Sequence, residues 1–180
     1  MVAVIHTSNS LNMVLNYNEQ KAKQGKAECL MAVNYPKDVE QLNFYQKLHR
    51  LTNLAALNEQ AQRNGIHISL NFDPSEKLDK EKLGAIAKDY MDRIGFGKQP
   101  FLMYEHHDAG HPHIHIVTTN IEANGRRIEL HNIGRNQSTV ARKEIEIKYQ
   151  LIKADGRKPQ QVNEIIPITA SKIQYGKSDT

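Results

Sequence analysis

Cysteine is almost absent from this sequence, since Cys29 is the only one among 180 residues. A single thiol excludes a disulfide framework and a cysteine-ligated zinc finger, and it fits a protein kept in a reducing compartment. Long apolar runs are also missing, and the N-terminus lacks the pattern of a signal peptide. We therefore expect a soluble, cytoplasmic protein with no membrane insertion.

The motifs of two common enzyme classes are missing as well. No glycine-rich phosphate loop is present, and the order of predicted elements does not suggest a doubly wound fold. The H-E-x-x-H helix of metalloproteases is absent too. Internal repeats and low-complexity tracts are not found in the sequence. The length instead fits one domain of ordinary size, large enough for a real core.

The composition is that of a globular protein. Hydrophobic residues make up 39% of the chain and charged residues 24%, and the formal net charge is +4. This mildly basic balance is compatible with nucleic-acid binding but does not demonstrate it. Periodic patterning fades beyond Asp155. We predict a catalytic domain over residues 1–155 and a loose C-terminal extension over residues 156–180. One interpretation of this extension is that the chain is truncated and that a further region follows it in a longer protein.

Histidine is concentrated in one stretch of the chain. Five of the nine histidines lie in residues 105–117, which read E-H-H-D-A-G-H-P-H-I-H-I-V. The second half of this stretch alternates polar and apolar residues, which predicts a half-buried strand. Side chains two residues apart on a strand share a face, so His111, His113 and His115 can line one side of it.

A second predicted strand comes directly before the histidines. Residues 100–105 read as a strand, and the D-A-G that follows the histidine pair has turn chemistry. Two antiparallel strands joined there would place His106 opposite His113, with His115 one step further along the same face. A slip of one residue would offer His107 instead, so the register stays open at this point.

The chemistry that suits such a cluster is metal binding. Neutral imidazoles bind Zn, Mn, Fe, Ni or Cu, and three ligands leave positions open for water or substrate. A ligating histidine usually donates its other N–H to a carboxylate, and Asp108 is the nearest candidate. The alternative is a histidine-rich surface turn with no ligand function. The spacing H-x-D-x-x-H-x-H-x-H favours the metal site over that alternative.

Hydrophobic periodicity predicts further strands and helices over the rest of the chain. An apolar stripe that begins at Leu11 marks a helix that carries Tyr17. The predicted fold is α+β, with a largely antiparallel sheet of about five strands and helices packed on one face. The ranges are strands at 1–5, 28–33 and 67–72, a long helix over 38–65 ended by Gly65, a helix capped by Asp79, an Asn-Gly turn in 121–128 and a last helix at about 138–152.

Three stretches together resemble a known family. The histidine motif, H-x-D-x-x-H-P-H-x-H followed by I-V, is similar to the metal-binding motif of conjugative relaxases, the HUH-type single-strand DNA endonucleases. N-Y-N-E-Q-K at 16–21 resembles the motif of their nucleophilic tyrosine, and H-I-S-L-N-F-D-P at 67–74 resembles their middle motif, which contacts DNA near the scissile phosphate. The likeness covers about residues 1–155 and is to mobilisation relaxases of MOB-P-like type, among them those of Bacteroides-type elements.

This resemblance implies a site-specific cut in one DNA strand at a transfer origin. Tyr17 would be the nucleophile and would form a 5′-phosphotyrosyl bond, leaving a free 3′-hydroxyl. A divalent ion on His106, His113 and His115 would polarise the phosphate, with Mn²⁺ or Mg²⁺ expected in function and Zn²⁺ or Ni²⁺ as bound alternatives. Asp108 would orient a ligand or help to take the tyrosine proton.

Other residues are candidates for supporting contacts. We treat His107 and His111 as candidate outer partners of the metal ligands, and His111 also as a DNA contact. Expected partners are single-stranded DNA at the transfer origin, accessory mobilisation proteins and a coupling protein. For any one basic residue, a solvated charged surface is an equally good interpretation. The DNA-binding candidates are Lys21, Lys23, Lys26, Ser69, Asn71, Arg126, Arg127 and Arg135.

Alternatives remain for Tyr17 and for the function. Three residues after Val14 and four after Met13, Tyr17 fits a half-buried core position, and the chain has seven tyrosines. The leading hypothesis is a strand transferase of the relaxase type. The second is a metal-dependent phosphodiester hydrolase that activates water with no covalent step, and the third is a non-catalytic single-stranded DNA-binding module. Activity of a Tyr17→Phe variant separates the first two.

Overall fold

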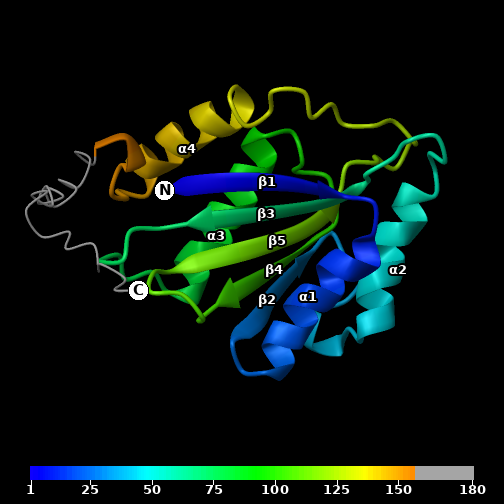
Figure 1. Cartoon of the computed structure of the whole chain (residues 1–180), viewed down its shortest axis with the longest axis horizontal. Coiled ribbons are helices and arrows are strands. Elements are labelled where there is room, and N and C mark those ends of the chain that lie inside the picture. Colours follow the sequence, from blue (N-terminus) through cyan, green and yellow to red (C-terminus); the bar gives the residue numbers. More distant parts are fainter. Residues whose placement is uncertain (157–180) are drawn as a thin grey trace, which may run out of the picture.

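The computed structural model describes residues 1–156, so the predicted C-terminal extension lies outside the described residues except for Gly156. Within the described part the chain forms five strands and four α-helices (Figure 1). The strands are β1 (Val2–Ser8), β2 (Ala27–Val33), β3 (Gly65–Asn71), β4 (Phe101–His106) and β5 (His113–Thr119). The helices are α1 (Leu11–Lys23), α2 (Phe44–Ala55), α3 (Lys80–Arg93) and α4 (Gln137–Lys148).

The five strands form one open sheet in the order β1-β3-β5-β4-β2 (Figure 1). Every neighbouring pair is antiparallel. The strands β4 and β5 are neighbours because only a short turn joins them, and a turn of that length can connect antiparallel strands alone. The prediction of an α+β fold with a five-stranded antiparallel sheet is confirmed.

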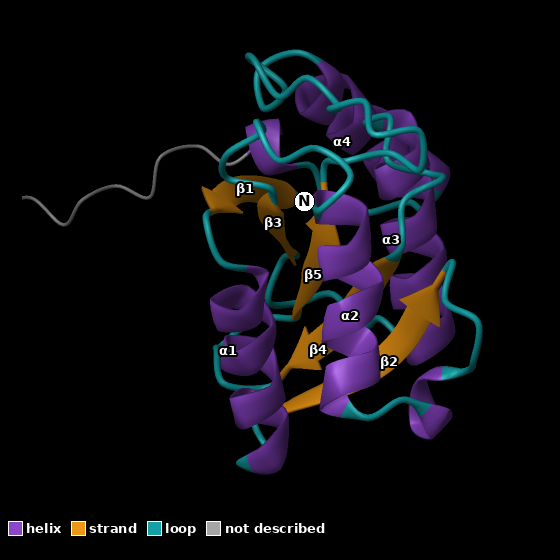
Figure 2. Ribbon diagram, turned by 90° about the vertical axis from the view of Figure 1, so that its right-hand side faces the viewer, coloured by secondary structure: helices purple, strands orange, loops and turns teal. Residues whose placement is uncertain are grey.

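The helices cover both faces of the sheet, and the prediction that they pack on one face is wrong. The core face carries Met103 and Ile116 and packs against α3 and α4. The histidine face carries Leu102, Val117 and the clustered histidines, and α1 and α2 cover its apolar part. Figure 2 shows the strands between α1 and α3. Residues 101–104 are all buried, so β4 is apolar on both faces and both must be covered.

The long helix predicted over residues 38–65 is much shorter in the structure. A 3-10 turn at Val39–Gln41 is followed by α2, which ends at Ala55, and Gly65 begins β3 instead of capping a helix. The start of α2 is fixed by a capping box, in which Asn43 and Gln46 each accept from the other's backbone N–H at 3.0 Å. The polar residues after α2 offer no apolar stripe that could extend it.

The remaining predicted elements are present with shifted bounds. Asp79 caps α3 as predicted, by accepting from the backbone N–H of Lys82. The Asn-Gly sequence forms a turn in which Gly125 has a φ of 80°, a conformation that glycine adopts without strain. The last helix, α4, ends at Lys148 and not near residue 152.

Candidate functional site

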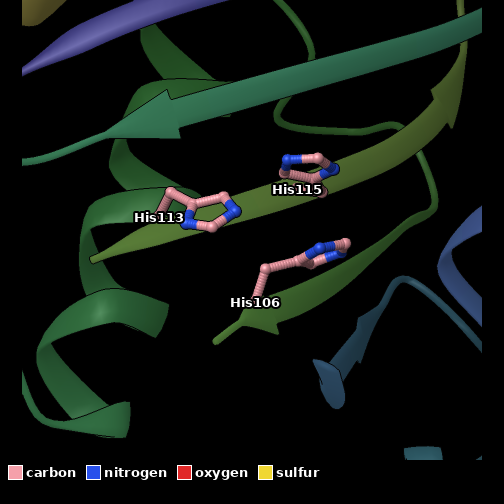
Figure 3. A group of neighbouring side chains, drawn as sticks. All are labelled: His106, His113 and His115. Carbon is pink, nitrogen blue, oxygen red and sulfur yellow. The ribbon is translucent and has the colours of Figure 1, made fainter. Parts of the chain in front are cut away.

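Three histidines meet on the histidine face, at one end of β4 and β5. The strand register pairs His106 with His113, and His115 lies two residues further along β5. One ring nitrogen of each lies within 4.8 Å of those of the other two. Figure 3 shows the three rings gathered on the same side of their strands. The predicted register is confirmed, since His106 and not His107 pairs with His113, and His107 belongs to a separate group with two glutamates.

Two of the three rings have one nitrogen engaged by a group that fixes the position of its proton. The Nδ1–H of His113 donates to the carbonyl oxygen of His111 at 3.2 Å, which leaves Nε2 with a free lone pair. The Nε2–H of His106 donates to Oδ1 of Asn18 at 2.9 Å. The remaining nitrogen of His106, Nδ1, is buried and makes no hydrogen bond to any residue that the structure describes. This buried ring nitrogen is therefore available to a ligand.

The third ring, His115, is engaged by another histidine. Its Nδ1 lies 3.0 Å from Nε2 of His67, and the two rings meet edge to face. Burial lowers the pKa of His115 to about 3 and the pKa values of His106 and His67 to about 4, and neighbouring histidines add to the effect. These rings are neutral at physiological pH, which is the form of imidazole that binds metals.

Asp108 lies beside the unengaged nitrogens. Its Oδ1 is 3.7 Å from Nδ1 of His106 and 3.5 Å from Nε2 of His113. Its Oδ2 accepts a hydrogen bond of 2.6 Å from Nζ of Lys21. This bond lowers the pKa of Asp108 to about 2, so the carboxylate is ionised at neutral pH. It adds negative charge at the position where the free nitrogens converge.

Tyr17 extends from α1 over the histidines. The buried stripe of α1 runs through Leu15 and Asn18, and Tyr17 falls outside it with 46% of its surface exposed. Its ring centroid is 6.2 Å from that of His106 and 6.2 Å from that of His115. The placement argues against a core role, because the phenol faces the cluster and solvent and not the apolar interior.

The donor set of this cluster fits a divalent metal ion. Three imidazoles each keep one nitrogen for a ligand, the buried Nδ1 of His106 has no other partner, and a carboxylate stands next to them. Imidazole suits transition metals such as Mn, Ni and Zn. A second group contains Glu28 and His107, which are exposed, and the half-buried Glu105, and Glu28 is paired with Lys80 at 2.7 Å. We assign no metal to this second group.

The predicted middle motif lies on the same face as the histidines. In the β3–β5 register, Ser69 is opposite His115 and Asn71 is opposite His113. The Nε2–H of His111 donates to Oδ1 of Asn71 at 3.2 Å, which ties the two motifs together. These three side chains therefore surround the cluster on the side away from β4.

The predicted basic residues are spread more widely. Lys23 and Lys26 are exposed near the C-terminal end of α1, on the Tyr17 side of the cluster. Arg126 and Arg127 are exposed on the turn that follows the far end of β5. Arg135 lies just before α4, which packs on the core face. The structure thus brings the lysines near the site but leaves the arginines apart from it.

Two residues that contact the histidines were not predicted. Asn18 is fully buried, and His67 is partly buried on β3. Asn18 carries a recognisable signal, because it continues the stripe of Leu15 as a polar residue on the apolar side of a helix. His67 alternates with isoleucines in the manner of the other histidine strand, but which ring it meets depends on the pairing of β3 with β5.

A buried polar contact fastens α1 to the sheet beneath Tyr17. Oη of Tyr104 donates to Oε1 of Glu19 at 2.6 Å, and Nζ of Lys47 on α2 donates to the same oxygen at 2.6 Å. The Lys47 and Glu19 side chains are 8% and 15% exposed. Removing one partner of a buried ion pair costs about 3–5 kcal/mol, because the other charge is left uncompensated. This contact holds the helix turn of Tyr17 in place over β4.

The fold and the cluster define a class of protein. An open antiparallel sheet presents three histidines and a carboxylate beneath an exposed tyrosine, and so brings together the residue types that the resemblance to HUH-type DNA endonucleases implied. None of the described helices is long and apolar enough to cross a membrane.

Comparison with known families agrees with this class. Residues 17–151 match the family model "Relaxase: MobA/VirD2-like, nuclease domain", and the chain belongs to this family. A comparison with curated proteins gives no match. The protein is therefore a DNA endonuclease of the relaxase type, an enzyme that nicks DNA and whose domain binds single-stranded DNA.

Proposed function

We propose that this relaxase cuts and rejoins one DNA strand at a transfer origin with Tyr17 as the nucleophile, and so initiates conjugative mobilisation. The observation that carries the proposal is the position of Tyr17, which is exposed on α1 with its ring 6.2 Å from the rings of His106 and His115. We expect accessory mobilisation proteins and a coupling protein to act with it.

The proposed reaction is a transesterification. Oη of Tyr17 attacks the scissile phosphorus, a bond forms between them, and the bond from phosphorus to the 3′ oxygen breaks. The phenol gives up its proton, and the departing 3′ oxygen takes one up to become a hydroxyl. One phosphodiester replaces another, so the energy of the bond is kept in the 5′-phosphotyrosyl link and the reverse step rejoins the strand.

Three histidines are assigned to hold a divalent ion in this reaction. His106 would bind through Nδ1, and His113 and His115 through Nε2, because their other nitrogens are engaged. When bound, the ion supplies charge that polarises a non-bridging phosphate oxygen. Three imidazoles favour Mn²⁺, Ni²⁺ or Zn²⁺, whereas Mg²⁺ prefers oxygen ligands and must draw on water and phosphate at this site.

We assign Asp108 an orienting role and not that of the general base. A base that takes a phenol proton works best with a pKa near the working pH, and the Lys21 hydrogen bond lowers the pKa of Asp108 to about 2. Its carboxylate instead faces the free nitrogens of His106 and His113 at 3.7 and 3.5 Å. There it offsets positive charge and keeps Lys21 beside Tyr17, with Nζ 5.9 Å from the ring centroid.

The DNA strand is expected to pass over the histidine face between α1 and the end of β3. Ser69 and Asn71 offer hydrogen-bonding groups on one side of the cluster, and Lys21, Lys23 and Lys26 offer positive charge on the other. Phosphate contacts of this kind position a strand without reading its sequence. The arginines at 126, 127 and 135 would contact DNA only away from the scissile phosphate.

A covalent-adduct assay tests the proposal. The protein is incubated with single-stranded DNA that spans the transfer origin of the element that encodes it, with and without Mn²⁺, and is run on a denaturing gel. Variants Tyr17→Phe and His113→Ala are compared with Tyr45→Phe. Tyr45 is a matched control because it is exposed, at 69%, and its ring contacts those of Phe44, edge to face, and His49 on α2.

The proposal predicts a Mn²⁺-dependent shifted band in the wild type and in Tyr45→Phe, and no band in Tyr17→Phe or His113→Ala. Cleavage without a shifted band that survives Tyr17→Phe would replace the proposal with the hydrolase. Binding of origin DNA without any cleavage would replace it with the binding module.

A further inference from the structure

Each histidine of the cluster must present an unprotonated nitrogen to a metal, and something must keep the proton on the other nitrogen. A neutral imidazole carries one N–H and one lone pair, and the hydrogen bond made by one nitrogen decides which is which. His113 has its proton fixed by the backbone carbonyl of His111. Within the described residues, His106 and His115 have no such backbone partner. The side chains of Asn18 and His67 contact one ring nitrogen of each instead.

The amide of Asn18 has a defined orientation. Its Nδ2 donates to the carbonyl oxygen of Val14 at 2.9 Å, and Oδ1 faces Nε2 of His106 at 2.9 Å. A flipped amide would set oxygen against the Val14 carbonyl and a donor against Nε2, so the observed orientation is the one that both partners satisfy. Oδ1 can only accept, and His106 must therefore carry its proton on Nε2. The lone pair is left on Nδ1, the buried atom without a partner.

The pair of His115 and His67 has two arrangements, and only one leaves a metal ligand. If Nε2–H of His67 donated to Nδ1 of His115, the proton of neutral His115 would lie on Nε2 and block that nitrogen. If Nδ1–H of His115 donates to Nε2 of His67, Nε2 of His115 keeps its lone pair. A metal therefore selects the arrangement in which His67 accepts and carries its own proton on Nδ1.

We propose that Asn18 and His67 are positioning residues that hold His106 and His115 in the tautomers that bind the metal. Asn18 has a further consequence, because it directly follows Tyr17 on α1. The same helix turn that sets the tautomer of His106 also carries the nucleophile, so seating of α1 on the sheet and completion of the metal site occur together. This inference rests on the metal site of the proposed function.

Metal affinity of the full chain tests the inference without use of DNA. Mn²⁺ and Zn²⁺ affinities are measured by competition with a chromophoric chelator for Asn18→Leu, Asn18→Asp, His67→Leu and His67→Gln. Leucine keeps much of the volume but accepts no hydrogen bond, and each Leu variant is expected to bind about 10–100-fold more weakly. Asp and Gln keep an oxygen acceptor and are expected to stay within about threefold of wild type.

The two variants of Asn18 also separate positioning from simple packing. Asn18→Asp loses the bond to Val14 and places a carboxylate near that carbonyl, so its melting temperature falls while metal affinity is retained. Asn18→Leu keeps the helix packed and loses metal affinity. If affinity instead followed melting temperature, with Asp weak and Leu unaffected, the inference would be overturned.

A spectroscopic measurement reports the tautomer directly. Long-range ¹H–¹⁵N correlation of the imidazole nitrogens in the metal-free protein is expected to show His106 with its proton on Nε2 in the wild type and as a mixture in Asn18→Leu. An unchanged His106 spectrum in Asn18→Leu would contradict the inference. Failure of the adduct assay with intact, variant-sensitive metal binding would sink the proposed function alone, whereas normal adducts with metal affinity unchanged in all four variants would sink the inference alone.

Discussion

The two faces of β5 differ in every respect that matters for function, although they belong to the same seven residues. On the core face, Ile114 and Ile116 have no exposed surface and pack in the larger apolar cluster. On the histidine face, His113 and His115 bring unengaged nitrogens to one point. Because the side-chain period of a strand is two, a register slip would exchange the faces and lose both. The apolar residues therefore fix the geometry of the site.

The energetics of the two faces are also opposite. Burial of an isoleucine stabilises the fold by about 1.5–3 kcal/mol. Burial of neutral histidines and of Asn18 costs free energy unless their polar atoms have partners. The histidine face meets part of that cost with the contacts to Asn18, His67 and a backbone carbonyl, and it leaves Nδ1 of His106 unmet. We interpret this unsatisfied nitrogen as a destabilising feature that is retained because it serves as a metal ligand.

The largest effect is expected from His115→Ala, which removes a proposed ligand from the histidine face. Metal affinity should fall by more than the roughly 100-fold that an outer partner costs. The unfolding free energy of the metal-free protein should change by only about 1 kcal/mol at neutral pH, because the ring is not part of the apolar core. Chelator competition measures the metal affinity, and denaturant titration measures the unfolding free energy. Unchanged metal affinity would exclude His115 as a ligand.

The opposite change on the same strand is Ile116→Ala. Truncation of this fully buried side chain should lower the unfolding free energy by about 2–5 kcal/mol. Metal affinity of the protein that remains folded should stay close to wild type. The two variants, one residue apart, should therefore have opposite profiles in stability and in metal binding. If both variants lost metal affinity equally, the separation of the two faces would be wrong.

Acid should weaken the metal-free protein through the histidine face. The pKa values of His106, His67 and His115 are lowered by burial to about 4, 4 and 3, against about 6.5 in an unfolded chain. Between these values the unfolded chain binds more protons than the folded one, so stability is lost as pH falls below about 6.5. Each histidine contributes a slope of about 1.4 kcal/mol per pH unit. Denaturant titrations between pH 7.5 and 5 measure it.

A control for this pH dependence is His115→Gln, which cannot titrate. The unfolding free energy of this variant should fall less steeply with decreasing pH over the same range, because one titrating histidine is missing. A wild-type profile that is flat between pH 7.5 and 5 would contradict the buried neutral state of these rings.

The smallest effect is expected from Lys21→Met at the exposed rim. The Lys21–Asp108 pair is partly exposed to solvent, so its loss should leave the unfolding free energy nearly unchanged. The logarithm of DNA affinity falls linearly with the logarithm of salt concentration. If Lys21 contacts a phosphate, this slope should become less steep by about 0.7, the contribution of one phosphate contact on a single strand. Fluorescence anisotropy measures the slope with a labelled single strand short enough to cover only the histidine face. Arg135→Met is the control that should leave the slope unchanged, because Arg135 lies just before α4 and apart from that face.

The sequence predicted the histidine face in part because strand periodicity is a local property. The alternation of His113 and His115 with isoleucines, and the short turn before them, predicted that His106 or His107 lies opposite His113, and the family resemblance favoured His106. His107 was rejected only by the structure, since a slip of one residue is invisible in the pattern. Asn18 and His67 went unrecognised because their partners come from other elements, and that contact depends on how α1 and β3 pack.

The errors in the fold have a similar origin. The predicted helix over residues 38–65 runs too far because the polar residues after α2 carry no strong stop signal before Gly65. Gly65 fits a helix cap by its residue type, and nothing local shows that it opens a strand. The placement of all helices on one face failed because residues 101–104 are buried on both sides of β4, which a strand of unknown neighbours does not reveal. Hydrophobic periodicity predicts individual helices and strands, whereas the order in which they stack in layers depends on contacts between them.

The central claim is that Tyr17 forms the covalent bond to DNA, and the most direct measurement is the identity of the linked peptide. After incubation with origin single-stranded DNA and Mn²⁺, the adduct is digested with nuclease and trypsin and analysed by mass spectrometry. Residues 1–20 contain no lysine or arginine, and Tyr17 is their only tyrosine. Cleavage after Lys21 therefore yields a peptide that carries Tyr17 and no other tyrosine from these residues. The account predicts a nucleotide mass on this segment, localised to Tyr17 by fragmentation. A nucleotide on another tyrosine, or cleaved DNA with no modified peptide, would contradict it.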